Sequence, residues 1–311
     1  MRAQFAFWRK VVSKHQVTFF ISSFNRGTYL ANCVHSVQSC VPNSRIHVLD
    51  DGSTDPDTIG VLSRLRVPIT DISLETRWEQ AGSRGGLSRG LNFAVHELTT
   101  TPIVVLLQDD MQIVRPIASA EILKVAEALR SSPKAFAYYT FLKESRELVA
   151  YHDNVFGWHF PEGASGYGFA AASMVDVKKV QSAGFEFGEE KETSRRAAER
   201  WGPMPILRDP FAMFLPWPQS FRSRSKTIAH RVWEASGPTG FVPWETMQES
   251  DISRLITRPD SEHAVADYYL TPSRAVRYPL RYNGLGAAPR VIRVLSEVEL
   301  RMRAWMRSFR R

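Results

Sequence analysis

The chain has 311 residues, 43% of them hydrophobic and 23% charged, an ordinary balance for a folded globular protein that argues against intrinsic disorder. Its longest apolar runs have the length of strands, and none reaches the roughly 18 to 20 residues of a membrane-spanning helix. Residues 1–15 form a basic N-terminal segment without the continuous apolar centre of a signal peptide. Two cysteines, Cys33 and Cys40, are too few for a disulfide scaffold, so we expect a reducing, cytoplasmic location.

The positive charge is concentrated at the C-terminus. The formal net charge is +8, and residues 273–311 contain ten arginines and two glutamates, which gives 10 − 2 = +8. A basic tail indicates an anionic partner, such as a lipid surface, an acidic polymer or a nucleic acid. The alternative is a helix face that is simply solvated.

The first half of the chain alternates strand-like and helix-like segments. The expected strands are residues 17–21, 45–49, 68–74 and 103–107, and the expected helices are residues 29–40, 57–65 and the segment ending near residue 99. This order predicts an α/β fold with a mostly parallel sheet that is covered by helices on both faces.

The second half is less regular. Helices are expected at residues 123–130, 178–184 and 190–201, and residues 135–142 and 149–152 could pair as strands. Residues 156–168, rich in glycine and aromatic side chains, and residues 202–245, rich in proline and tryptophan, are expected to form loops.

Two acidic pairs follow apolar strands directly. Asp50 and Asp51 come after the second expected strand, and Asp109 and Asp110 come after the fourth. In parallel sheets, ligands bind outside the carboxyl ends of the strands. Carboxylates at that edge can hold a divalent cation, which stabilises the negative charge of a diphosphate leaving group.

Four segments, in this order and spacing, resemble family-two glycosyltransferases of the GT-A fold. They are Ser22–Arg26, Asp50–Asp55, Gly86–Asn92 and Leu107–Asp110. The resemblance covers roughly residues 15–205 and implies transfer of a sugar, with inversion, from a nucleotide-diphosphate sugar to an acceptor hydroxyl. We expect a GT-A catalytic domain over 16–245, with a donor half at 16–115 and an acceptor half at 116–245. A C-terminal extension with a basic amphipathic helix would follow at 246–311.

The resemblance implies a donor-binding role for several residues. Asp51 would contact the nucleobase, with Ser23 and Phe24 beside it, and Arg84 or Arg89 would face the diphosphate. The alternative for either arginine is a solvated charge on a loop or helix.

The resemblance also implies that Asp109 meets the ribose and Asp110 binds a divalent metal, Mn²⁺ or Mg²⁺. The family often has an Asp-x-Asp sequence, and its first aspartate position is Leu107 here. Because related enzymes also use a bare Asp-Asp pair, metal binding is still expected.

The acceptor must lose a proton as it attacks, and a carboxylate can act as the general base. By resemblance, this base is Glu190, at the start of a helix. Glu189 and Glu192 stay in contention, because glutamate is one methylene longer than the aspartate that the family usually has at this place. The alternative for these acids is structural, since acids in a first helical turn complement the helix dipole. Trp158 is the candidate for stacking on a saccharide or lipid-linked acceptor, with packing as the alternative.

The tail has apolar residues at alternating steps of four and three, which predicts an amphipathic helix. They are Val291, Leu295, Val298, Met302, Trp305 and Phe309. This stripe within residues 290–311 could pack on the catalytic domain, pair with a second chain as a homodimer, or lie on an anionic membrane at its inner face.

The leading hypothesis is therefore an enzyme of surface polysaccharide or glycoconjugate synthesis. The competing hypothesis is a catalytically inactive nucleotide-sugar-binding or scaffold protein of the same fold. Nucleotidyl transfer ranks lower, because the first expected strand is not followed by a basic, glycine-rich loop. The chain has no P-loop sequence and no recognised nucleic-acid-binding module, so no nucleic-acid partner is expected.

Overall fold

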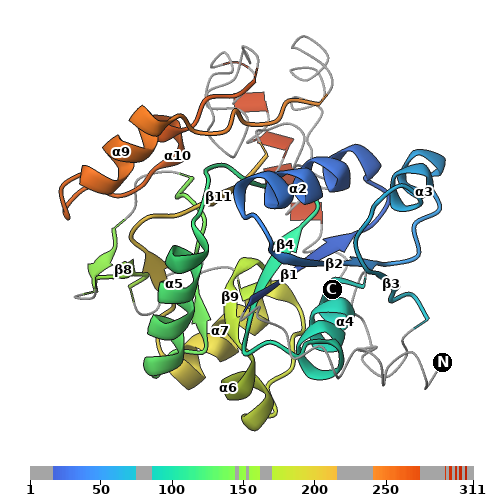
Figure 1. The fold of residues 1–311 in the computed structure, drawn as a ribbon, viewed down its shortest axis with the longest axis horizontal. Helices are drawn as coiled ribbons and strands as arrows, with labels where there is room; N and C mark the ends of the chain where they lie inside the picture. The colour runs from blue at the N-terminus through green and yellow to red at the C-terminus, as the bar shows by residue number, and fades with distance from the viewer. Residues whose placement is uncertain are drawn as a thin grey trace. The chain divides into compact units, whose positions relative to one another are not determined.

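Strand β1 (Val17–Ser23) lies inside a six-stranded sheet of order β3-β2-β1-β4-β9-β6 (Figure 1). β2 (Arg45–Asp50) and β4 (Ile103–Gln108) pair with β1 in parallel on its two sides, and β3 (Ile69–Asp71) pairs in parallel with β2. The remaining two strands, β9 (Met174–Asp176) and β6 (Phe136–Ala137), run antiparallel to their neighbours. The predicted mostly parallel sheet is confirmed.

The computed structural model describes most of the chain. The described residues are 17–74, 86–143, 147–151, 154–161, 170–215 and 241–273, together with Val291, Val294, Leu295, Val298, Glu299, Arg301, Met302, Trp305 and Met306. Within these ranges, no helix has both the length and the apolar composition needed to cross a membrane. Cys33 and Cys40 are buried and form no disulfide.

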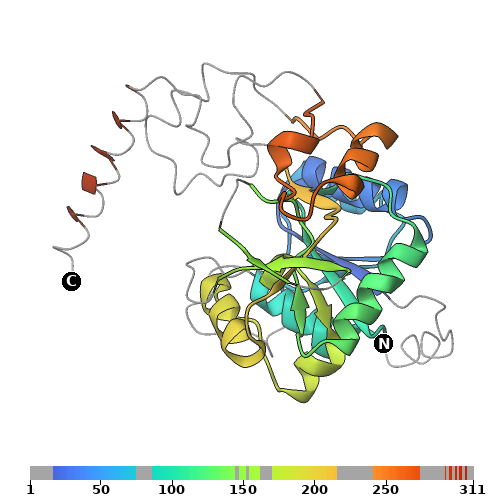
Figure 2. The same cartoon turned by 90° about the vertical axis from the view of Figure 1, so that its left-hand side faces the viewer.

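Helices cover the sheet on both faces. They are α2 (Gly27–Cys40), α3 (Pro56–Leu62), α4 (Leu87–Phe93), α5 (Ser119–Ser131), α6 (Val177–Ser182) and α7 (Glu190–Trp201). Figures 1 and 2 show α2 and α3 on one side of the sheet and α4 on the other. Local signals fix the start of α3: Asp55 caps it by accepting the Thr58 N–H at 2.9 Å, and Pro56 takes the first helical position.

The contacts between residues group the chain into two compact units. The first consists of Met1–Asp109, Ile117–Tyr139 and Leu148–Arg208, and the second of Asp110–Pro116, Thr140–Glu147 and Asp209–Arg311. The second unit contains a two-stranded sheet of β5 (Met111–Ile113) and β11 (Ala212–Phe214), with α9 (Glu249–Thr257) and α10 (Ala266–Tyr269). Inside it, the buried Arg258 pairs with Asp209 at 2.8 Å.

Some expectations for the second half are wrong. Residues 135–142 do not pair with residues 149–152. Instead β6 pairs with β9, and β7 (Val149–Ala150) pairs with β8 (Phe156–His159). β8 lies in an expected loop, as do β10 (Pro205–Leu207), which pairs with it, and β11. These strands are two to four residues long, too short to show an alternating pattern in the sequence.

His47 in β2 is an uncharged member of the sheet. Burial, with a smaller contribution from the nearby Arg45 charge, lowers the pKa of His47 to about 4. Its Nε2 lies 2.8 Å from the Thr70 hydroxyl. The neutral ring therefore satisfies a polar contact without placing a charge beside the apolar strand β1.

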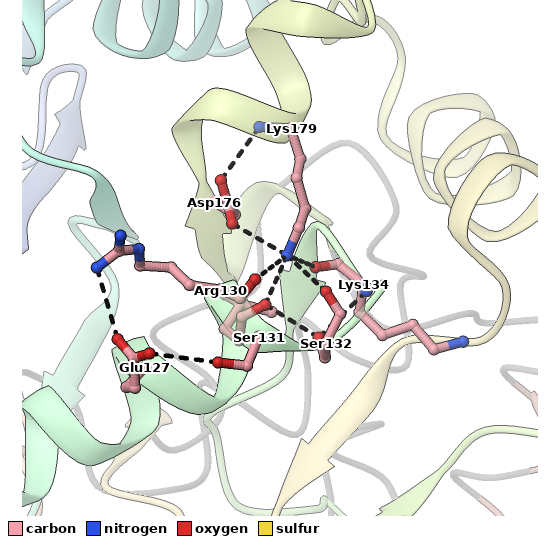
Figure 3. A network of polar contacts seen from close by, with 8 residues as sticks. Glu127, Arg130, Ser131, Ser132, Lys134, Asp176 and Lys179 are labelled. Atoms are coloured by element: carbon pink, nitrogen blue, oxygen red, sulfur yellow. Dashed lines mark hydrogen bonds and ion pairs between the residues drawn. The ribbon is translucent and has the colours of Figure 1, made fainter.

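The end of α5 is held by Lys179 of α6 (Figure 3). The last carbonyls of a helix have no partner within the helix and carry partial negative charge. The Lys179 ammonium lies 2.7 to 3.1 Å from the carbonyl oxygens of four residues and 3.0 Å from the Asp176 carboxylate. The four carbonyls belong to Leu129, Arg130, Ser132 and Lys134. One side chain thus joins two helices of the first unit.

Lys179→Met should lower the free energy of unfolding by about 2–4 kcal/mol, because charge-assisted bonds are lost and partly buried carbonyls are left without a partner. Urea unfolding followed by circular dichroism measures this change. The matched control is Lys178→Met, which alters the exposed neighbouring lysine and should stay within about 0.5 kcal/mol. Equal losses in the two variants would contradict this role for Lys179.

Candidate functional site

The end of β1 brings two of the predicted aspartates together. The backbone N–H of Asp51 donates to the Ser23 carbonyl, and that of Asp109 donates to the Ser22 carbonyl, each at 3.0 Å. Because neighbouring strands lie about 4.8 Å apart, the chains that follow β2 and β4 emerge on the two sides of one strand. Asp51 and Asp109 therefore flank the carboxyl end of β1.

The loops after β1 and β2 are locked together by side chains. Asn25, with φ of 52°, accepts the N–H groups of Thr54 and Asp55 at 2.7 and 2.9 Å, and its own N–H donates to the Ser53 hydroxyl. Asp50 accepts both the N–H and the hydroxyl of Ser53, at 2.8 and 2.6 Å. The first aspartate of this pair is thus committed to shaping the loop.

Asp51 is held by the start of α4. Its carboxylate accepts the Gly86 N–H at 2.7 Å and pairs with Arg89 Nη2 at 2.6 Å. The contact with Gly86 is so close that a Cβ there would lie 2.0 Å from Asp51 Oδ1. Arg89, predicted to face a diphosphate, therefore binds Asp51, and among the described residues its buried Nε has no hydrogen-bond partner.

Asp109 is almost completely buried at the end of β4, with 2% of its side chain exposed. It accepts the Phe24 N–H and pairs with Arg26 Nη1, both at 3.4 Å. Sequence reasoning missed Arg26, although it closes the Ser22–Arg26 segment that carries the resemblance. The Phe24 ring is 42% exposed, and the buried Ser23 hydroxyl makes no hydrogen bond to any described residue.

Asp110 is the first residue of the second unit and is 7% exposed. Its carbonyl accepts the Leu215 N–H at 2.8 Å. Across the described ranges, no three histidine, cysteine or acidic side chains gather closely enough to hold a metal on their own. The Asp110 carboxylate nevertheless has the oxygen ligands that suit a hard cation such as Mg²⁺, which commonly takes one or two carboxylates together with substrate phosphates.

The acids expected to include the base lie at the start of α7. Glu190 is its first residue, Glu189 is its N-cap, and both are exposed. Glu192 is bound by the Arg195 guanidinium at 2.6 and 2.9 Å, and this hydrogen bonding lowers the pKa of Glu192. A lowered pKa disfavours Glu192 as the general base.

Asn92 of α4 anchors the segment that leads into α7. Its amide nitrogen donates to the Phe187 carbonyl at 2.8 Å, and its oxygen accepts the Phe187 N–H at 2.7 Å. The same helix therefore binds Asp51 through Arg89 and holds the acidic segment through Asn92. The signal for Asn92 in the sequence is its place at the end of the Gly86–Asn92 segment that carries the resemblance, but the sequence does not indicate its partner.

The structure describes one of the two remaining predicted residues. Trp158 is in β8, where it pairs with Ile206 of β10, and its side chain is 5% exposed. This burial favours packing over a sugar-stacking surface, and the acceptor role stays a prediction. Arg84 lies outside the described residues.

The close approach of Gly86 to Asp51 gives a direct test of the site geometry. Gly86→Ala should cost about 1–3 kcal/mol of unfolding free energy, because the new methyl group must displace the Asp51 carboxylate. In an Asp51→Ala background this cost should largely disappear, since the clashing atoms are gone. Thermal and urea unfolding of the four proteins in this cycle measures the coupling.

The control for this cycle is Gly60→Ala in α3, where the added methyl group would only touch the Arg64 guanidinium at 3.6 Å. It should be neutral or slightly stabilising. An unchanged cost of Gly86→Ala after removal of the Asp51 side chain would show that another contact limits this position.

Comparison with known proteins supplies independent findings. Residues 18–168 match the family model described as glycosyl transferase family 2. No curated protein matches the sequence.

Among solved structures, S. aureus TarS 1-349 is 14% identical over 64% of this chain and 60% of that chain, with a TM-score of 0.46. Mannosyltransferase PcManGT from Pyrobaculum calidifontis, in complex with GDP-Man and Mn²⁺, is 13% identical over 74% and 68%, with a TM-score of 0.44. Glucosyl-3-phosphoglycerate synthase from Mycobacterium tuberculosis, in complex with Mn²⁺, UDP and glucosyl-3-phosphoglycerate, is 14% identical over 66% and 74%, with a TM-score of 0.42. This chain spans half the length of a second TarS structure.

Proposed function

We propose that this chain, whose residues 18–168 match the family model of glycosyl transferase family 2, transfers a sugar from a nucleoside-diphosphate sugar to an acceptor hydroxyl. The observation that carries the proposal is the position of Asp51 and Asp109 on the two sides of the carboxyl end of β1. In a parallel α/β sheet this edge is where ligands bind.

The nucleoside would be bound by residues at this edge. Asp51 would accept a hydrogen bond from the base, and Asp109 would accept one from a ribose hydroxyl. Phe24 offers an exposed ring for stacking, and the buried Ser23 hydroxyl offers a group that a bound nucleoside or a water could satisfy. Arg89, whose Nε is buried, would contribute positive charge next to the anionic donor, and Arg84 is proposed for the same role.

A divalent cation, Mn²⁺ or Mg²⁺, would be held by Asp110. When bound, it would offset the negative charge that develops on the departing diphosphate. The residues of this chain would orient the donor and keep its phosphates close to the cation. Such stabilisation is electrostatic and depends on groups whose positions are set before the reaction.

Glu190 would remove the proton from the acceptor hydroxyl as that oxygen attacks the anomeric carbon, with Glu189 as the alternative. In-line attack opposite the diphosphate inverts the anomeric centre. Asn92 supports this step indirectly, because it fixes the backbone of Phe187 just before the two glutamates.

The acceptor would be a saccharide or lipid-linked saccharide in surface polysaccharide or glycoconjugate synthesis, contacted by Trp158 if that side chain becomes accessible. We propose a cytoplasmic enzyme at the inner face of the membrane, with a homodimer as one further arrangement. The catalytic domain would extend over 16–245. A nucleotide-sugar-binding protein without turnover is the second candidate.

Asp110→Ala should abolish metal-dependent turnover while leaving the fold intact. Hydrolysis of nucleotide sugars with Mn²⁺ or Mg²⁺ measures turnover. Thermal unfolding with UDP, with and without Mn²⁺, measures binding, and the stabilisation by the metal should also be lost. Full metal-dependent activity in this variant would remove Asp110 from the mechanism, and nucleotide-sugar binding without turnover in the unaltered protein would favour the second candidate.

Glu190→Gln should reduce turnover by about 10²-fold or more while donor affinity changes little, because the amide keeps the shape but cannot accept the proton. Glu189→Gln is the matched control, as the adjacent exposed acid. Donor affinity is measured by calorimetry and turnover by release of the nucleoside diphosphate. If Glu189→Gln loses turnover and Glu190→Gln does not, the base is Glu189.

A further inference from the structure

The C-terminal helical stretch has an apolar face that is exposed. Its described apolar residues are Val291, Val294, Leu295, Val298, Met302, Trp305 and Met306, each 49% to 67% exposed. At 100° per residue, these positions fall within an arc of about 120°. A soluble surface normally scatters such side chains singly, so a continuous stripe indicates a contact surface.

Positive charge accompanies this stripe. Residues 290–311 contain seven arginines and two glutamates, a net charge of 7 − 2 = +5, and no arginine takes a position within the apolar arc. Arg301, the arginine of this segment that the structure describes, is exposed. One face is therefore apolar, and every arginine of the segment falls outside it.

We propose that residues 291–306 bind an anionic lipid bilayer, with the apolar face in the boundary between headgroups and acyl chains. A helix with tryptophan, leucine and methionine on one face and arginines on the other lies in the plane of such an interface. Anionic headgroups complement the net charge of +5, and each arginine near the surface adds to the attraction.

A second copy of this helix is a weaker match for the same face. The apolar arc is wider than a strict coiled-coil seam, because Val294 and Met306 extend it on both sides. Two copies would also bring like charges together, whereas a lipid surface neutralises them. The biological role of this membrane binding rests on the proposed function, since binding would bring the transferase to lipid-linked acceptors.

The test is co-sedimentation of the full chain with vesicles of phosphatidylcholine alone and of phosphatidylcholine mixed with phosphatidylglycerol. Binding is expected to the anionic vesicles and to weaken as salt rises. Leu295→Glu should reduce the affinity at least about tenfold, since it removes a large apolar group and adds a negative charge. Arg301→Ala should reduce it about fivefold.

The matched control is Leu123→Glu, which changes an exposed leucine of α5 in the same way and should bind vesicles like the unaltered protein. Equal binding to neutral and anionic vesicles, or unchanged binding of Leu295→Glu, would overturn the proposal. So would a dimer in light scattering that Leu295→Glu dissociates while no vesicles are bound. Donor hydrolysis in solution should be unchanged by Leu295→Glu, and its absence in every protein would reject the proposed function while leaving the vesicle result intact.

Discussion

The arrangement of the first unit depends on one strand that is hydrogen-bonded on both sides. β1 lies between β2 and β4, and its last carbonyls accept the N–H groups of Asp51 and Asp109. The apolar residues of β1 and β4 are buried, so neither strand can shift its register without exposing them. Burial of a hydrophobic sheet thereby fixes the positions of two carboxylates at its edge.

Helix α4 extends this constraint to the rest of the candidate site. Through Arg89 and Gly86 it holds Asp51, and through Asn92 it holds the backbone just before α7. The sequence that starts this helix combines a glycine for close approach, an arginine and an asparagine. The glycine and the arginine share one partner, Asp51, and the asparagine binds the Phe187 backbone, which explains why a glycine-rich segment and a helix follow one another here.

The sequence predicts the parts of the fold whose signals are long. β1 and β4 are continuous apolar runs, and α7 has the predicted bounds, 190–201. The short strands of the second half are not predicted, because pairing between distant segments decides them. For the same reason the sequence identifies Arg89 as a notable arginine but gives no indication that its partner is Asp51, 38 positions away. The roles of Arg26 and Asn92 likewise become apparent only from the residues that they bind in the fold.

In each of the two acidic pairs, one aspartate beside β1 forms an ion pair with an arginine. In the first pair, both carboxylate oxygens of Asp50 bind Ser53 in the loop, and the Asp51 carboxylate forms an ion pair with Arg89. In the second pair, Asp109 is bound by Arg26 and by the Phe24 N–H. Each aspartate beside β1 is therefore compensated by an arginine, which lowers the repulsion between two acids at one edge. Under the proposed function, an anionic donor would meet two guanidinium groups as well as two carboxylates. This balance would let one edge of the sheet bind a negatively charged diphosphate next to the acids proposed to bind its nucleoside.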